Sequence, residues 1–72
     1  MTQPSGLALH NGNIYVSDFP TGRIYAFNTD GKLIDWLDTQ RTNALGGMEF
    51  HPDGSLYVVD SVANEVLCIQ PR

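Results

Sequence analysis

Short apolar runs alternate with polar turn sequences along the whole chain. The apolar runs are rich in Ile, Val, Tyr and Phe, which favour β-strands. Asn11-Gly12, Asp30-Gly31 and Asp53-Gly54 separate three pairs of runs, and they are hairpin signals because Gly, Asn and Asp accept a positive φ at low cost. No window has a convincing helical period with caps. The pattern predicts an all-β chain with strands near 6–10, 13–18, 23–28, 33–38, 47–51, 55–60 and 65–69.

The chain also contains an internal repeat. Residues 6–10 (Gly-Leu-Ala-Leu-His) align with residues 47–51 (Gly-Met-Glu-Phe-His), 41 positions later. Residues 12–18 align with residues 54–60 at a spacing of 42, so the extra residue falls in the turn. The match continues from residues 24–27 to residues 66–69. A period of about 40 to 45 residues is typical of four-stranded β-propeller blades.

The repeat predicts two tandem antiparallel propeller blades, the first over 1–40 and the second, incomplete, over 41–72. Residues 39–46 are expected to form a polar connection between them. The second blade lacks its outer strand, which Met1–Gln3 of another copy could supply. Closed propellers need about four to eight blades, so we expect these two to be part of a larger or oligomeric propeller. An independent seven-stranded sandwich is the alternative.

Charge and composition narrow the partners. The 72 residues carry eight acidic and four dispersed basic side chains, for a net charge of −4. This balance disfavours nucleic acid and anionic membranes as partners, since both attract clustered Lys and Arg. No apolar run approaches the roughly 20 residues of a membrane span. The N-terminus lacks the features of a signal peptide, although a trimmed exported or periplasmic origin fits equally well, so the compartment stays open.

Residues 4–9, 14–18 and 22–27 resemble NHL repeats and blades of the SMP-30/gluconolactonase family. The resemblance covers nearly the whole chain and implies propeller architecture. In the lactonase branch it also implies a divalent metal held by an Asn, an Asp and a Glu, with the Asp as the proposed base. The positions of the Asn and Asp are occupied here by Ser5 and Gly46. Gly46 has no side chain and Ser5 is a poor ligand for such a cation, so we expect no metal or other cofactor at this site and favour a non-enzymatic role.

Four polar residues recur at equivalent repeat positions. Asp18 and Asp60 end the second strand of each repeat, where they are expected to accept hydrogen bonds from backbone amides of the following loop rather than act as paired catalytic carboxylates. His10 and His51 end the innermost strands. In a ring of copies they could form a circle of imidazoles at the channel mouth, and the alternative is a solvated or turn-bonded histidine.

Several other residues carry structural expectations. Gly12 and Gly54 are turn residues of the blades, and Tyr15 and Tyr57 are expected to pack between blades. Asp35 and Asp38 point to opposite faces of a strand and so make a poor catalytic pair, but they can discourage edge aggregation. Trp36 is a candidate anchor for a partner or for a neighbouring blade. Cys68 is expected to be a buried, inert thiol.

These features favour a protein-interaction or assembly scaffold. Two stacked blades cover only the faces between them, so the outward faces would expose apolar side chains. Association of identical chains would cover both, and a trimer with six blades is the favoured ring, ahead of a four-copy ring. The alternatives are another propeller or complex chain as partner, a fragment of a metal-dependent lactonase-type hydrolase, and a structural subunit that uses open sheet edges.

Overall fold

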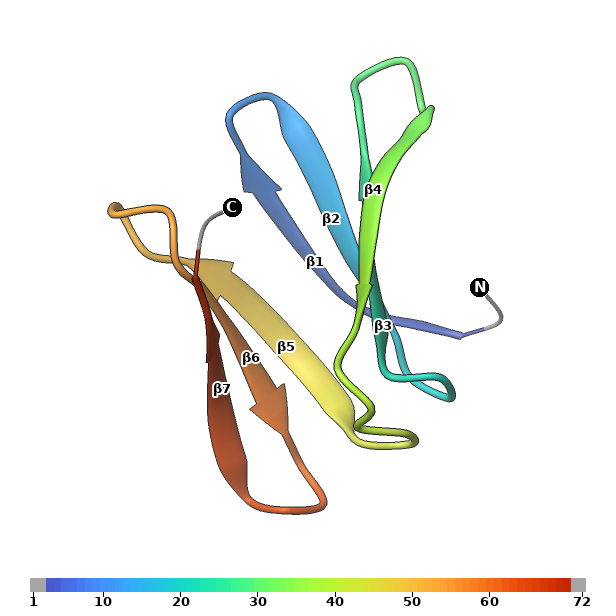
Figure 1. Ribbon diagram of the computed structural model, residues 1–72, viewed down its shortest axis with the longest axis vertical. Coiled ribbons are helices and arrows are strands. Elements are labelled where there is room, and N and C mark those ends of the chain that lie inside the picture. The colour runs from blue at the N-terminus through green and yellow to red at the C-terminus, as the bar shows by residue number, and fades with distance from the viewer. Residues whose placement is uncertain (1–2, 71–72) are drawn as a thin grey trace.

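The computed structural model describes residues 3–70, which form seven β-strands in two antiparallel sheets (Figure 1). In both sheets, strands that are consecutive in the sequence are hydrogen-bonded neighbours. The first sheet contains β1 (Pro4–His10), β2 (Asn13–Asp18), β3 (Arg23–Phe27) and β4 (Leu33–Asp38). The second contains β5 (Leu45–Phe50), β6 (Leu56–Asp60) and β7 (Glu65–Ile69). The all-β prediction and the count of four strands followed by three are confirmed.

The expected hairpin turns lie where the sequence placed them. Gly12, Gly31 and Gly54 have φ angles of 77°, 80° and 93°, and each lies in the turn between two antiparallel strands. These angles fall in the left-handed region, where a side chain is costly and glycine is not.

Met1, Thr2, Pro71 and Arg72 lie outside the described residues, and so does most of the segment expected to supply an outer strand. Within residues 3–70, the structure has no helix long and apolar enough to cross a membrane.

The connection between the sheets differs from its prediction. Residues 39–46 were expected to be a polar linker, but β5 begins at Leu45, whose side chain is 1% exposed, and Ala44 is buried as well. The strand starts early because Leu45 pairs with the last residue of β6 across a bulge, and the Ala44 carbonyl accepts a hydrogen bond from the Ser61 amide. The linker between the sheets is therefore short and ends inside the core.

The linker is also bonded to the turn between β2 and β3. The Gly22 carbonyl accepts hydrogen bonds from the Thr39 amide, at 3.0 Å, and from its hydroxyl, at 2.6 Å. The Asn43 amide donates to the Phe19 carbonyl at 2.9 Å. A Cβ at Gly22 would lie 2.7 Å from the Arg41 carbonyl oxygen, so this approach requires glycine, as does its φ of 74°. These bonds fix where the second sheet begins relative to the first.

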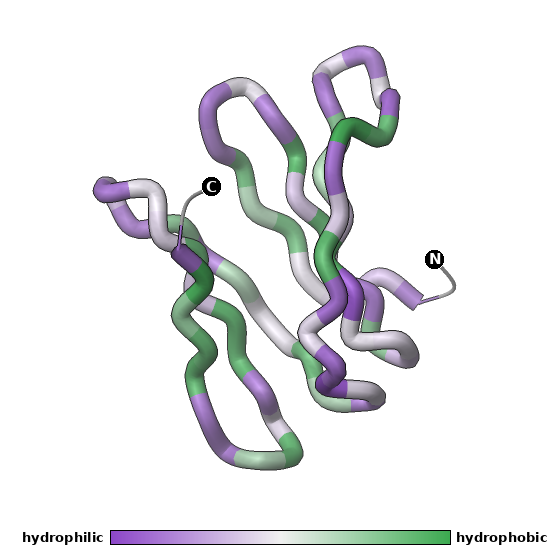
Figure 2. The backbone as a smooth tube through the Cα atoms, in the orientation of Figure 1, coloured by the Kyte–Doolittle hydropathy of each residue, from purple (hydrophilic) through white to green (hydrophobic). Residues whose placement is uncertain are grey.

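The two sheets meet through their first strands and separate toward their last strands. Among the described strands, backbone contacts between the sheets are confined to β1 and β2 against β5 (Figure 1). The buried apolar core lies between the sheets and draws on both of them, and hydrophobic residues recur along both (Figure 2). Its buried members are Ala8, Ile24, Leu45, Leu56 and Val58. A face-to-face sandwich would bring the later strands together as well, so the arrangement is a wedge.

A glycine allows the first strands to come close. A Cβ at Gly6 would lie 2.7 Å from the Gly46 carbonyl oxygen and 2.9 Å from the Ser17 hydroxyl, which is closer than real side chains pack. The same Cβ would lie 3.4 Å from Cγ of Met48 on β5. Ser17 is fully buried here, and its hydroxyl reaches the Gly46 carbonyl at 3.5 Å. We call this contact between β1 and β5 the internal junction.

Two valines provide a matched test of the core. Val58 is fully buried and Val62 is 74% exposed. We expect Val58→Ala to lower the free energy of unfolding by about 1.5–3 kcal/mol, because it removes buried methyl groups and leaves a cavity. Val62→Ala should change it by less than about 0.5 kcal/mol. Urea denaturation at one fixed protein concentration measures both, and equal losses would show that the buried core is misplaced.

Candidate functional site

Asp60 uses its carboxylate to hold the loop between β6 and β7. The residue is 2% exposed, and Oδ1 accepts hydrogen bonds from the backbone amides of Val62, at 3.0 Å, and Ala63, at 2.8 Å. Oδ2 accepts a hydrogen bond from Nη1 of Arg41 at 3.0 Å. The pKa of Asp60 is lowered, chiefly by the hydrogen bond from the Ala63 amide, and Arg41 acts in the same direction. These are the backbone contacts expected of this residue, and the ion pair adds to them.

Asp18 occupies the equivalent position in the first sheet with different partners. It is fully buried, and its Oδ1 accepts a hydrogen bond from the Gln3 amide at 3.0 Å. Its Oδ2 accepts one from the Thr21 hydroxyl at 2.6 Å. That hydroxyl in turn accepts a hydrogen bond from the Arg23 amide. The carboxylate thus links the residue before β1 to the loop after β2.

The two repeated histidines have different surroundings. The His10 ring stacks on Phe50 with centroids 4.4 Å apart, and its Nε2 is 3.2 Å from the side-chain amide of Asn11. Nδ1 of His51 lies 3.1 Å from Oδ1 of Asp53, and the His51 ring meets Tyr57 edge-on at 6.1 Å. The pKa of Asp53 is lowered, chiefly by the hydrogen bond from the Ser55 amide, with His51 contributing less. Each histidine therefore has turn or stacking partners of its own.

Ser5 and Gly46 lie on either side of one buried hydroxyl. The Ser5 hydroxyl is 2.9 Å from the Ser17 hydroxyl, which also reaches the Gly46 carbonyl. These groups therefore contribute to the internal junction. Among residues 3–70, no three His, Cys, Asp or Glu side chains gather in an arrangement that could hold a metal ion.

The outer strand β4 carries a charged and aromatic cluster that the sequence did not reveal. The guanidinium of Arg23 lies 4.9 Å from the centroid of the Trp36 ring, and its Nε lies 3.9 Å from Oδ2 of Asp38. The pKa of Arg23 is raised, chiefly by a side-chain hydrogen bond with Tyr25. Only the register of β3 against β4, which pairs Arg23 with Asp38 and Tyr25 with Trp36, brings these residues together. The indole remains half exposed.

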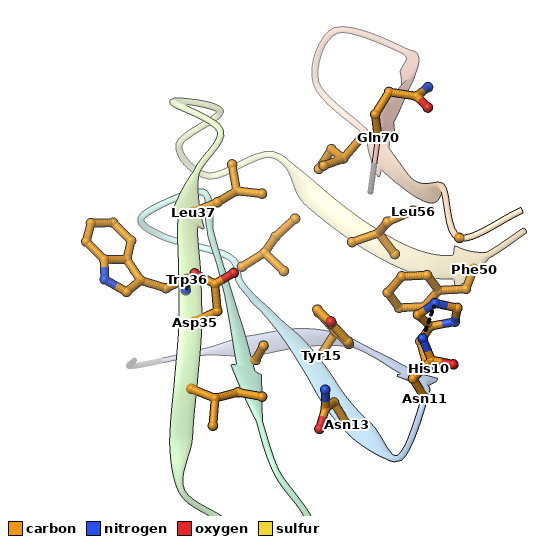
Figure 3. Close-up of a pocket in the computed structure, with 15 residues that line it drawn as sticks. His10, Asn11, Asn13, Tyr15, Asp35, Trp36, Leu37, Phe50, Leu56 and Gln70 are labelled. Carbon is orange, nitrogen blue, oxygen red and sulfur yellow. Dashed lines mark hydrogen bonds between the residues drawn. The ribbon is translucent and has the colours of Figure 1, made fainter. Parts of the chain in front are cut away.

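A cleft opens between the sheets where they separate. Its volume is about 360 Å³, and its apolar lining includes Ile24, Leu37, Leu56 and Ile69. In Figure 3, Leu37 and Asp35 extend from β4 toward the second sheet, and the Trp36 indole extends to the opposite side. The cleft is thus a wedge lined by apolar side chains and by polar ones, which include His10, Tyr15 and Asp35.

The prediction for Cys68 is wrong, because the thiol is exposed. Cys68 pairs across β6 and β7 with Tyr57, and both face away from the first sheet. No further sheet of the described residues covers this side of β7, so the thiol faces solvent. For the same reason Tyr57 is 39% exposed, whereas Tyr15 packs edge-on against Phe50 with centroids 4.8 Å apart. Of the two tyrosines, Tyr15 therefore packs between the sheets.

No protein-family model matches this chain, and no curated protein matches it.

The lowered pKa of Asp60 predicts a dependence of stability on pH. A carboxylate whose folded-state pKa lies below its ordinary value of 3.8 stabilises the fold above that value, and the stabilisation is lost as the pH falls through the folded pKa. We expect the Tm of the natural chain to fall more steeply than that of Asp60→Asn between about pH 5 and pH 2. Asp30→Asn, on an exposed turn, is the control and should keep the natural slope in thermal circular dichroism. Equal slopes for all three would contradict the role of Asp60.

The surroundings of Ser5 and Gly46 predict no tight divalent-cation binding. Calcium, zinc or manganese titrated into the chain should give no binding heat in calorimetry and no rise in Tm. For comparison, a cation present at 100 times its dissociation constant would stabilise the fold by about 2.7 kcal/mol. A micromolar site that disappears in Ser5→Ala would overturn this expectation.

Proposed function

We propose that this chain is a non-enzymatic assembly scaffold, made of two NHL-like propeller blades that complete a ring by self-association or with a partner chain. The wedge arrangement supports the blade assignment. In a propeller the first strand of every blade lies nearest the centre and the last strands lie at the rim. Here β1 and β5 lie side by side, whereas β4 and β7 do not contact each other.

The observation that carries the proposal is apolar surface on both outward faces. On the first sheet, Leu7 and Leu9 are 64% and 69% exposed. On the second sheet, Val66 is 63% exposed, and Val59 is also exposed beside it. Soluble monomers rarely expose contiguous apolar patches larger than a few hundred Å². Further sheets packed on both faces would remove these side chains from water.

Three buried polar residues also fit a structural role. The carboxylates of Asp18 and Asp60 are buried and bonded to loops, and Ser17 is bonded at the internal junction. Ser17, Asp18 and Asp60 are not among the residues that line the 360 Å³ cleft. These three side chains therefore serve the fold, and the exposed apolar faces are available for partners.

Sedimentation across a dilution series tests the proposal. We expect the chain to sediment as a closed oligomer, with a trimer favoured, and to lose β-structure as it dissociates at low concentration. Analytical ultracentrifugation gives the mass, and far-UV circular dichroism on the same samples gives the folded fraction. If it persists as a cooperatively folding 7.9 kDa monomer at micromolar concentration, the proposal is wrong.

A further inference from the structure

The outward face of the first sheet has a counterpart inside the chain. Strand alternation and register place one set of apolar side chains on this face, which we call the free face of the first sheet: Leu7, Leu9, Ile14, Val16, Tyr25 and Phe27. In the repeat alignment these positions correspond to Met48, Phe50, Leu56, Val58, Leu67 and Ile69. The counterparts are the residues of the second sheet that pack against the first. The free face of the first sheet is therefore the repeat equivalent of the face of the second sheet that packs against the first sheet.

The converse holds for the second sheet. Its outward face, which we call the free face of the second sheet, consists of Gly47, Glu49, Tyr57, Val59, Val66 and Cys68. The corresponding positions in the first sheet are Gly6, Ala8, Tyr15, Ser17, Ile24 and Ala26. Of these, Ala8 and Ile24 belong to the buried core, and Gly6 and Ser17 form the internal junction. The internal junction therefore joins two different kinds of face, one from each sheet. The chain also leaves one face of each kind uncovered, namely the free face of the first sheet and the free face of the second sheet.

We propose that a second copy of the chain docks head to tail, with the free face of its first sheet against the free face of the second sheet of its neighbour. The contact repeats the internal junction between copies. This inference rests on the proposed function and specifies its partner and orientation. Because the two faces differ, the contact is heterologous, and it propagates around a ring instead of stopping at a two-fold dimer.

Gly47 is the residue that supports this arrangement most directly. A Cβ built on Gly47 has no atom within 4 Å, and its φ lies outside the left-handed region, so nothing within the chain requires glycine there. Its repeat counterpart Gly6 is needed, because a Cβ there would lie 2.7 Å from the Gly46 carbonyl oxygen. Docking by the same geometry places Gly47 under Leu7 of the neighbouring copy, as Gly6 lies under Met48. The glycine is then required by the assembly.

Two substitutions are expected to change the association in opposite directions. Gly47→Leu adds a side chain at a position whose counterpart in the internal junction, Gly6, has no room for one. We expect it to weaken association by about ten- to hundred-fold. Ala63→Leu, in an exposed loop, adds bulk elsewhere and should leave the dissociation constant unchanged. Glu49→Ala introduces the residue type found at the repeat counterpart, Ala8, and removes a carboxylate from the proposed contact. Association should therefore strengthen several-fold. Sedimentation equilibrium measures all three.

Cross-linking with a short bismaleimide tests the orientation independently of stability. Cys68 lies on the free face of the second sheet, and Leu9→Cys places a thiol on the free face of the first. The two-cysteine chain, Leu9→Cys with Cys68 retained, should form a ladder of covalent oligomers. The natural chain, and Leu9→Cys combined with Cys68→Ser, each carry one thiol on one face and should remain uncross-linked.

The outcomes separate this inference from the proposed function. A covalent dimer from either one-cysteine chain would mean that like faces meet, so the head-to-tail contact would be wrong while self-association stood. Unchanged association in Gly47→Leu would also overturn the contact alone. A folded monomer that cross-links in no variant would remove both. A chain that stays unfolded or aggregated until another protein is supplied would overturn the second copy as partner and leave a hetero-partner scaffold.

Discussion

The close approach of β1 and β5 is the contact on which the rest of the structure depends. It exists because Gly6 presents no side chain to the Gly46 carbonyl oxygen and because Ser17 supplies a hydroxyl in the space that remains. Ala8 can then reach the core formed by Leu56 and Val58 of the second sheet. With the first strands this close and the last strands apart, each sheet buries one face and presents the other to solvent.

The strands and turns followed from local chemistry. Alternating β-branched and aromatic residues defined the strands, and Gly12, Gly31 and Gly54 fixed the tight turns, since a positive φ is a backbone property that a short sequence can specify. The start of β5 could not be predicted in this way. Leu45 and Ala44 follow a run of polar residues, and the burial of Leu45 depends on pairing with Asp60, a contact between segments distant in the sequence.

The polar sites were less predictable than the strands. The equivalence of Asp18 and Asp60 was visible in the repeat, but their partners were not, because Gln3 comes from outside the first sheet and Arg41 from the linker. The exposure of Cys68 was missed because alternation shows which residues share a face and cannot show whether anything covers it. The cluster of Arg23 and Trp36 required the register of β3 against β4, which contains a bulge beside Ala26 and Phe27.

The bonded linker has a consequence for curvature. Thr39 and Asn43 fasten the linker to the turn between β2 and β3, and Gly22 lets the two segments approach, so the angle between the sheets is set by hydrogen bonds rather than by a flexible hinge. In any circular arrangement of such wedges, the angle per wedge determines how many complete the circle. A change at Gly22 would therefore alter the size of the circle as well as the stability of each piece. The number of members would then depend on a turn that belongs to neither free face.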